Sequence, residues 1–487
     1  MPAAPLAFAT RHPRLGAALG AIAISQSSPL AKLSGASPAV VTLFRGAIAL
    51  PFLAILAHRE GHRATRRDRL LGLAAGALFA TALPANAETG VSKSEIKLGI
   101  TLPMTGAASP GYNKLPGAMQ AYFDYVNANG GVNGRNVKLI VKDDGYLPTL
   151  AVAKTNELIL KDKVFAIVGA LGTANNKAVA RSVDLGRRGV PSLFINTGFS
   201  GFADRAKYPT TYPLFPSYIM EAKVMGKYLK DNFAGKKLGL IYQDDDFGAD
   251  AQAGFAAAGV KFDVSIPYAS GSQSATTAAG WVGKLKAAGA EVVVVFGVTS
   301  ATGATLAASA ALAYKPQWIL GSVGGDATTL KALGVPAAIL TGAQGASFLP
   351  SPGDANDEYV KQFTEIYKAA VPDGVFDNNV LVGMNTAMMT VQALRAAGKN
   401  PTRKSLMNAI GTKAFSWSSA SLSPILYTKT SHIGYNSYWF GTYNTSGVML
   451  PAGGKYTLYS TDSGSGAVTK SSYTRPDMPA KGLPTNS

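Results

Sequence analysis

Two glycine-rich loops carry the residues best suited to hold a small anion. The first, residues 169–175, follows an apolar run and leads into a helical pattern, so Thr173 and Ala174 stand beside the free N–H groups of a helix start. The second, residues 196–201, offers Gly198 and Ser200, and its glycines let the main chain approach a ligand closely. Amides and hydroxyls together favour an anionic oxygen, although Thr173 and Ser200 could also serve as ordinary helix caps.

Aromatic residues at two loop positions are candidates for an apolar wall. Tyr112 lies in the loop after the first apolar run, and Phe247 lies at the head of a later helix. Either ring would supply a large stacking surface, and either could instead be ordinary core packing. The neighbouring run 244–246 holds three aspartates but lacks the full spacing of a calcium loop, so we interpret it as a charged turn.

The residue inventory excludes most cofactor and catalytic chemistry. The chain has no cysteine and four histidines, so disulfides, thiolate sites and a multi-histidine metal site are ruled out. It contains no phosphate-binding P-loop and no G-x-S-x-G nucleophile motif. We therefore expect no enzyme, no cofactor and no metal. A hydrolase that uses two carboxylates is the alternative, because 28 acidic residues less Glu60 and Asp68 leave 26 after residue 87.

Length and charge set the remaining bounds. A chain of 487 residues has room for two lobes, and 47% hydrophobic residues can fill their cores. The formal charge is +18, of which residues 1–87 contribute +7 from nine basic and two acidic residues, leaving +11 over the remaining 400. Because these later charges form no basic block with interleaved aromatic residues, we expect no nucleic-acid partner.

The first 87 residues are predicted to be an apolar leader. Apolar residues fill positions 15–24, 39–57 and 70–83, and Arg45 interrupts the middle stretch. Three arginines precede the last stretch, which ends in Pro84-Ala85-Asn86-Ala87, the pattern of an export signal cleaved after Ala87. Residues 1 to about 60, chiefly 37–51, resemble the opening helices of EamA-type drug/metabolite transporters. Export is therefore expected, with a permanent membrane anchor in the leader as the alternative.

From residue 95 onward, short apolar runs alternate with helical patterns. The predicted strands are 96–101, 137–141, 165–169, 193–195, 237–242, 261–266, 291–296 and 317–320. Long helices are predicted after them, at 358–370, 378–397 and 401–410. This order favours an α/β fold of two doubly wound parallel-sheet lobes. Proline-rich stretches at 212–216 and 348–352 are predicted to cross between the lobes, and the tail from residue 470 to be loosely ordered.

Several separated motifs resemble the leucine/isoleucine/valine-type solute-binding proteins of ABC importers. They are Ile96-Lys97-Leu98-Gly99-Ile100 with Pro103-Met104-Thr105-Gly106, Asn127-Ala128-Asn129-Gly130-Gly131, Asp143-Asp144, Gly169-Ala170-Leu171-Gly172-Thr173, Gln243-Asp244-Asp245-Asp246-Phe247-Gly248 and His432-Ile433-Gly434. The resemblance implies a type I periplasmic-binding fold with three crossings, the third near residues 422–436. It implies lobe one over 90–214 and 350–425, lobe two over 215–349 and 430–460, and a polar tail over 461–487.

For function, the resemblance implies a binding protein outside the cytoplasm that closes on a small solute and presents it to an ABC permease. It also implies that the solute's carboxylate lies at the loop positions Thr173, Gly198 and Ser200. A membrane-anchored ligand sensor of the same fold is the alternative.

One position departs from the resembled family. Where its amino-acid binders place a glutamate for the ligand's ammonium group, this chain has Val323, and Val298-Thr299 stands in place of the glutamate's aromatic partner. A buried ammonium without a counter-charge is costly, so an amino acid would need another carboxylate, such as Asp326 or Asp246. We therefore expect a carboxylate-bearing or neutral organic solute, aromatic ones included, as readily as a branched-chain amino acid, with Thr299 as a further candidate contact.

Overall fold

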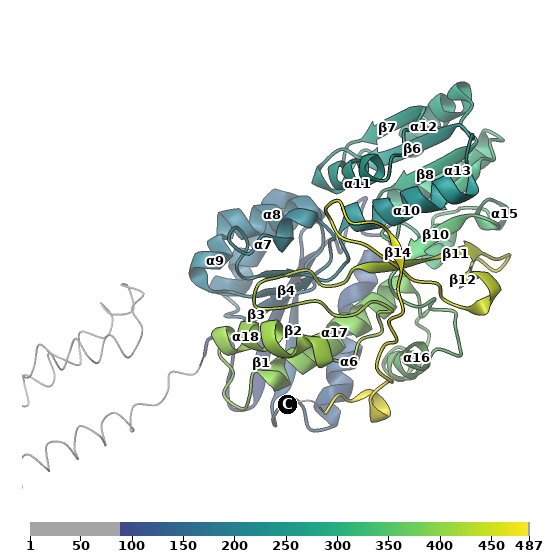
Figure 1. Ribbon diagram of the computed structural model, residues 1–487. Coiled ribbons are helices and arrows are strands. Elements are labelled where there is room, and N and C mark those ends of the chain that lie inside the picture. Colours follow the sequence, from purple (N-terminus) through teal and green to yellow (C-terminus); the bar gives the residue numbers. More distant parts are fainter. Residues whose placement is uncertain (1–87, 486–487) are drawn as a thin grey trace, which may run out of the picture. The chain divides into compact units, whose positions relative to one another are not determined.

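The computed structural model describes residues 88–485, which fold around two β-sheets (Figure 1). The leader expected over residues 1–87, with its export signal, membrane anchor and EamA-like segment, lies outside the described residues. Within residues 88–485, no helix is both long enough and apolar enough to cross a lipid bilayer.

The first sheet consists of five parallel strands. In chain order they are β1 (Glu95–Leu102), β2 (Asn136–Asp143), β3 (Ala166–Val168), β4 (Ser192–Ile195) and β5 (Thr211–Pro213). Their order across the sheet is β2-β1-β3-β4-β5, so the direction of winding reverses at β1. The connecting helices are α6 (Leu115–Ala128), α7 (Pro148–Leu160), α8 (Thr173–Val179) and α9 (Leu185–Arg188). This reversal places the loops after β1 and β3 beside a crevice at the carboxyl ends of the strands.

The second sheet repeats this design and is extended at one edge. Its parallel strands are β6 (Leu238–Gln243), β7 (Val264–Tyr268), β8 (Val292–Phe296), β9 (Gln317–Leu320) and β10 (Gln344–Ser347). Its connecting helices are α10 (Tyr218–Asn232), α11 (Asp246–Ala257), α12 (Ala275–Ala288), α13 (Thr299–Ala311), α14 (Ala327–Ala332) and α15 (Ala337–Leu340). The edge is completed by antiparallel β11 (Ser437–Tyr443), β12 (Met449–Pro451), β13 (Tyr459–Ser460) and β14 (Thr469–Lys470). The predicted α/β class with two doubly wound sheets is confirmed.

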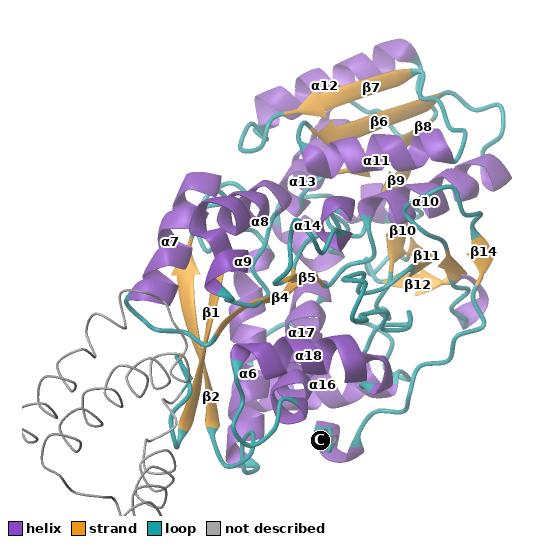
Figure 2. Cartoon of the chain, turned by 60° about the vertical axis from the view of Figure 1, so that its left-hand side comes forward, coloured by secondary structure: helices purple, strands orange, loops and turns teal. Residues whose placement is uncertain are grey.

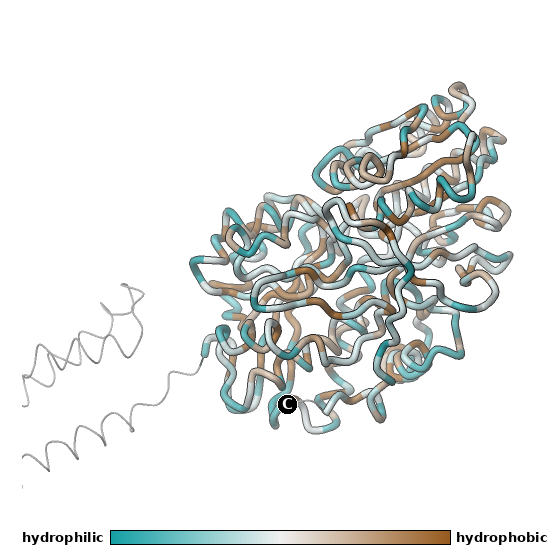
Figure 3. The backbone as a smooth tube through the Cα atoms, viewed as in Figure 1, coloured by the Kyte–Doolittle hydropathy of each residue, from teal (hydrophilic) through white to brown (hydrophobic). Residues whose placement is uncertain are grey.

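Burial explains why a strand inside the sheet, such as β8, is apolar without interruption. All five residues of β8 are buried, because helices cover both faces of a parallel sheet and leave no face for polar side chains. The hydropathy colouring of Figure 3 shows the same trend, with brown hydrophobic segments inside and teal hydrophilic ones along the outer helices and turns.

The three long helices after β10 return to the first sheet. They are α16 (Glu358–Ala370), α17 (Asn378–Ala396) and α18 (Arg403–Lys413), and α16 and α17 both pack against α6 (Figure 2). The stripe of α17 that carries Met384 and Met388 is fully buried, which confirms that it is a core-facing surface. The start of α17 is thereby held at the same end of the first sheet as the loops after its strands.

The chain crosses between the two sheets at three places that lie side by side. Phe215 follows β5 in the first crossing, Phe348 follows β10 in the second, and Tyr435 precedes β11 in the third. The rings of Phe215 and Phe348 have centroids 4.8 Å apart, and those of Phe348 and Tyr435 are 5.7 Å apart. The crossings therefore share one aromatic cluster.

Residues 461–485 make specific contacts with the rest of the fold, where a loose polar tail was expected. Strand β14 extends the second sheet beyond residue 460, and Arg475 then forms an ion pair with Asp357 and stacks on the ring of Tyr359 at 4.4 Å. Farther on, the hydroxyl of Tyr122 on α6 donates to the carbonyl of Gly482 at 2.7 Å. The prediction failed because the partners that order this segment lie on α16 and α6, more than one hundred residues earlier.

Candidate functional site

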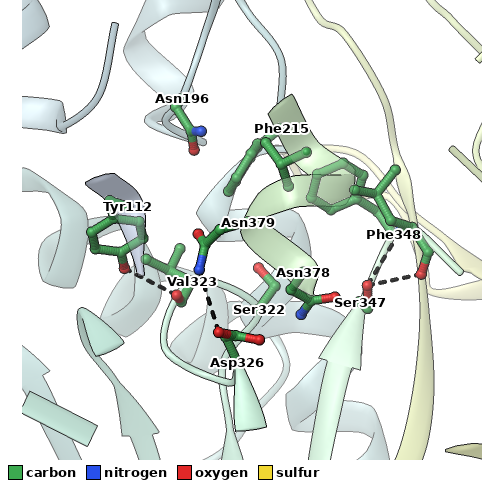
Figure 4. Close-up of a pocket in the computed structure, with 12 residues that line it drawn as sticks. Tyr112, Asn196, Phe215, Ser322, Val323, Asp326, Ser347, Phe348, Asn378 and Asn379 are labelled. Atoms are coloured by element: carbon green, nitrogen blue, oxygen red, sulfur yellow. Dashed lines mark hydrogen bonds between the residues drawn. The ribbon is translucent and has the colours of Figure 1, made fainter. Parts of the chain in front are cut away.

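A small cavity lies between the carboxyl ends of the two sheets, beside the crossings (Figure 4). Both halves of the fold line it: Tyr112 lies in a short 3₁₀ turn after β1 (Tyr112–Lys114), Asn379 lies at the start of α17, and Asp326 follows β9. Its full lining is Tyr112, Asn196, Phe215, Ser322, Val323, Asp326, Ser347, Phe348, Leu349, Asn378, Asn379 and Val382. Its free volume is about 30 Å³, room for one or two water molecules. A larger solute could enter only if the two halves moved apart.

A second, smaller chamber adjoins this cavity, and aromatic rings dominate its walls. The two spaces share Tyr112, Asn196 and Val323. The remaining walls of the second chamber are Tyr146, Leu171, Gly172, Tyr218, Phe247 and Val298. Together the two chambers combine polar groups with aromatic rings, which suits a small organic molecule with a polar group.

Tyr112 connects the two halves of the fold across these chambers. Its hydroxyl donates to the carbonyl of Val323 at 3.0 Å and accepts from the amide of Thr299 at 3.2 Å. Burial raises the pKa of Tyr112 to about 12, so the hydroxyl stays protonated. Thr299 is itself fully buried and does not border either chamber; its hydroxyl lies 3.4 Å from the same Val323 carbonyl. Thr299 thus does not line the cavity but holds Tyr112 and Val323, which do, in place.

Phe247 borders the second chamber, as its place at the head of α11 suggested. Asp245 caps this helix by accepting the Phe247 amide at 2.9 Å, which fixes the backbone at the chamber wall. The Phe247 ring packs against Tyr218 with centroids 4.4 Å apart. The side chain therefore serves both as core packing for the second sheet and as a wall of the chamber.

Thr173 lies behind the chamber wall. It is buried, and its hydroxyl pairs with the Thr197 hydroxyl at 2.7 Å. Thr197 is in turn hydrogen bonded to the hydroxyl of Tyr218, which does border the second chamber. Ala174 is half-buried and borders neither chamber. The predicted hydroxyl group is present near the cavity, but Leu171 and Gly172 are the residues of this loop that border the second chamber.

Gly198 and Ser200 border a different hollow, on the other side of Phe215. A side chain at Gly198 would collide with the Pro216 carbonyl, which lies 2.5 Å from the Cβ position. Glycine is therefore needed here so that the first crossing of the chain can pass close to this loop. The amide and hydroxyl of Ser200 donate to Asp250 of α11 at 2.6 and 3.0 Å. Ser200 does bind a carboxylate, but it is the side chain of Asp250 on α11, which packs against the second sheet. The structure does not bring Ser200 together with Tyr112 and Phe247 around one cavity.

The two acidic residues considered as partners for an ammonium group lie in different environments. Asp326 borders the first cavity and is 5% exposed. Burial, together with the negative charge of Asp377, raises the pKa of Asp326 to about 6. Asp246 lies outside the cavity and forms an ion pair with Lys177 of α8, with 42% of its side chain exposed. The charged turn at 244–246 thus joins the two halves of the fold at the surface.

A buried glutamate positions the loop that carries Val323. Glu221 of α10 is fully buried, and its carboxylate accepts the amide of Ser322 at 2.6 Å and the Ser322 hydroxyl at 2.8 Å. Burial raises the pKa of Glu221 to about 7. No pattern in the sequence pointed to this residue, because its partner lies 101 positions later in the chain.

Other cavity residues also went unrecognised in the sequence. Phe215 and Phe348 lie within the proline-rich crossings, which the sequence did reveal. Because crossings between two sheets pass beside the space between them, these aromatic residues could have been chosen as cavity residues. Tyr146 follows β2 as Tyr112 follows β1, which is a signal of the same kind. Asn379 carried no local signal, because its place depends on the return of α17 to the first sheet.

The comparisons with known proteins agree with this architecture. A family profile described as "Periplasmic binding protein" matches residues 95–448. An "Amino acid binding protein" of Pseudomonas aeruginosa is 30% identical over 205 residues, which cover 41% of this chain and 53% of that protein. "Leu/Ile/Val-binding protein homolog 3" of Brucella melitensis is 25% identical over 347 residues, which cover 66% of this chain and 88% of that protein. A branched-chain amino acid ABC transporter structure from Thermus thermophilus with bound valine superposes with a TM-score of 0.66 at 19% identity, covering 74% of this chain and 96% of that one.

Proposed function

The chain belongs to the periplasmic binding protein family, and we propose that it captures a small solute outside the cytoplasm and delivers it to an ABC permease. The solute is carboxylate-bearing or amino-acid-like. Two relatives support this class by their names, one an amino acid binding protein and the other a Leu/Ile/Val-binding protein homologue. The leader would direct export, with cleavage after Ala87.

The observation that carries this proposal is the origin of the cavity walls. Tyr112 and Asn379 come from elements of the first sheet, Val323 and Asp326 come from the second, and Phe215 comes from a crossing between them. A solute in this space would contact both halves at once. In the proposed division, lobe one comprises 90–214 and 350–425 and lobe two comprises 215–349 and 430–460.

Solute capture would then proceed by closure of the two lobes. Direct contacts already join them, among them Tyr112 with Val323, Lys177 with Asp246, and Ser200 with Asp250. These contacts can exist only when the lobes are together, so they favour the closed form, and a solute that touches both lobes favours it further. The permease would recognise this closed form.

Opening of the lobes would also expose the predicted anion-holding groups. Ser200 would bind a solute carboxylate in the open form, where lobe separation withdraws Asp250, and would return to Asp250 on closure. The Thr173 hydroxyl and the main-chain amides of Ala174 and Gly198 would donate further hydrogen bonds to the same carboxylate. Phe247 and Tyr112 would then pack against the apolar part of the solute, with Thr299 supporting Tyr112 from behind.

The test is ligand-induced thermal stabilisation of the purified protein across a panel of amino acids and aromatic and aliphatic carboxylic acids. A true ligand should raise the melting temperature in proportion to the logarithm of its concentration and should reduce the radius of gyration measured by X-ray scattering. Phe247→Ala should weaken the response, whereas Phe415→Ala, at a residue that is 73% exposed, should leave it unchanged. Stabilisation without any dependence on Phe247 would place the ligand elsewhere, and no response to any member of the panel would refute solute capture for these classes.

A further inference from the structure

Glu221 is a buried acid without a positive partner. It lies in the first turn of α10 and is fully buried. Among residues 88–485, no Lys, Arg or His forms an ion pair with it. The ionisable groups that face it are the hydroxyls of Tyr218, on its own helix, and Tyr438, on β11, and burial raises the pKa of both above the ordinary value. The start of a helix favours a negative charge, but that benefit does not require burial, so a second role is needed to explain this residue.

Both oxygens of Glu221 bind one residue of the loop between β9 and α14. Oε1 accepts the Ser322 amide at 2.6 Å, and Oε2 accepts the Ser322 hydroxyl at 2.8 Å. Ser322 also lines the first cavity, whereas Glu221 does not. The carboxylate therefore holds the cavity wall in place without being available to a solute.

The next residue of this loop makes the contact between the two halves of the fold. The Val323 carbonyl accepts the Tyr112 hydroxyl at 3.0 Å, a bond drawn in Figure 4. The same hydroxyl accepts the Thr299 amide at 3.2 Å. Because Ser322 and Val323 are adjacent in the chain, a shift of Ser322 displaces the carbonyl that Tyr112 needs. The grip of Glu221 on Ser322 is thus one bond network away from lobe closure.

Protonation of Glu221 would weaken that grip. An ionised carboxylate accepts hydrogen bonds at both oxygens, whereas a carboxylic acid uses one oxygen as a donor and no longer accepts both Ser322 groups equally well. Hydrogen bonds to an ionised group are also about twice as strong as those between neutral groups. Burial raises the pKa of Glu221 to about 7, so both forms are populated at neutral pH.

We propose that Glu221 is a positioning residue that makes lobe closure depend on pH: the ionised carboxylate fixes the Val323 carbonyl where Tyr112 reaches it, and uptake of a proton releases the loop and favours the open form. The inference rests on the proposed lobe closure and adds its regulation. The coupling is reciprocal, because closure holds both Ser322 donors against Glu221 and so lowers its affinity for a proton. Closure is therefore favoured as the pH rises through neutrality.

The experiment measures the radius of gyration of the solute-free protein by X-ray scattering between pH 6 and pH 9. Glu221→Gln keeps the shape and hydrogen bonding of the protonated side chain but cannot ionise. Ser322→Ala keeps the amide that Glu221 accepts and removes the hydroxyl. Glu365→Gln, at an exposed glutamate of α16, is the matched control. Burial raises the pKa of Asp250 and of Asp326 to about 6, so the informative quantity is the difference between wild type and Glu221→Gln at each pH.

Glu221→Gln should be more open than the wild-type protein at pH 8 and should match it at pH 6, where both side chains are neutral. From pH 6 to pH 8 the closed-to-open ratio of wild type relative to Glu221→Gln should rise about fivefold, the part of one charge-assisted hydrogen bond that titrates in this range. Ser322→Ala should move the midpoint of this transition up by about one pH unit. Glu365→Gln should follow wild type throughout.

A difference between wild type and Glu221→Gln that is the same at pH 6 and pH 8 would overturn the inference. If Glu221→Gln fails to fold, an unchanged midpoint in Ser322→Ala overturns it instead. Tyr112→Phe separates this outcome from failure of lobe closure, because it removes the contact itself. An opening in Tyr112→Phe without any effect of Glu221 would leave closure standing, and no change in any variant or at any pH would count against both. The thermal response to the solute panel tests solute capture separately.

Discussion

A single histidine in the third crossing should make this protein lose stability in mild acid relative to variants that lack the histidine. The His432 side chain is 1% exposed and packs against the ring of Tyr212 in β5, with centroids 4.0 Å apart. Its Nδ1 has no hydrogen-bond partner among the described residues. Burial lowers the pKa of His432 from 6.5 to about 4, so the folded protein keeps this ring neutral at pH values where an exposed histidine takes up a proton.

The sign and the size of the effect follow from this difference. Between pH 6.5 and 4 the unfolded chain binds a proton at His432 that the folded chain does not, so the contribution of His432 to the free energy of unfolding falls as the pH falls. Over the whole window the loss from this residue is about 3 kcal/mol, of which about 2 kcal/mol falls between pH 7 and pH 5.

The assay is urea unfolding at pH 7, 6 and 5, followed by tryptophan fluorescence, for the wild-type protein and for His432→Gln and His432→Phe. Each substitution has its own cost that does not depend on pH, so the informative quantity is the change with pH in the difference between wild type and variant. Buried acids such as Asp250, whose pKa burial raises to about 6, titrate in all three proteins and cancel in that difference. A difference that is the same at pH 5 and pH 7 would refute the assignment of a neutral buried His432.

Two further substitutions test the C-terminal segment and the contact between the lobes. Arg475→Ala should lower the free energy of unfolding by about 3 kcal/mol, because it leaves the buried carboxylate of Asp357 without its partner; a loss below about 0.5 kcal/mol in urea unfolding would show that the segment is not held there. Tyr112→Phe should shift the lobes toward the open form by about tenfold, because the Val323 carbonyl and the Thr299 amide lose their shared hydroxyl. X-ray scattering should then show a larger radius of gyration than that of the wild-type protein. The control Tyr125→Phe, which removes a hydroxyl bonded at the surface, should leave the radius of gyration unchanged.

Much of the fold was predictable from local pattern, for a physical reason. Strand β8 reads as five consecutive apolar residues, and such a run is stable only where helices cover both faces of a sheet. The crossings at Phe215 and Phe348 were marked by prolines, which end regular structure. The tail beyond Lys470 was not predictable, because its order depends on Asp357 and Tyr122, whose positions only the assembled helices determine.

The candidate site was predictable only where one strand positions a residue by itself. Tyr112 and Phe247 reach the chambers because each lies just beyond the carboxyl end of a parallel strand, the edge at which such sheets bind ligands. Ser200 lies in an equivalent loop but bonds to Asp250, 50 positions later on α11. No sequence rule identifies which groups on two separate sheets will meet, so the partner of Ser200 and the role of Asn379 required the structure.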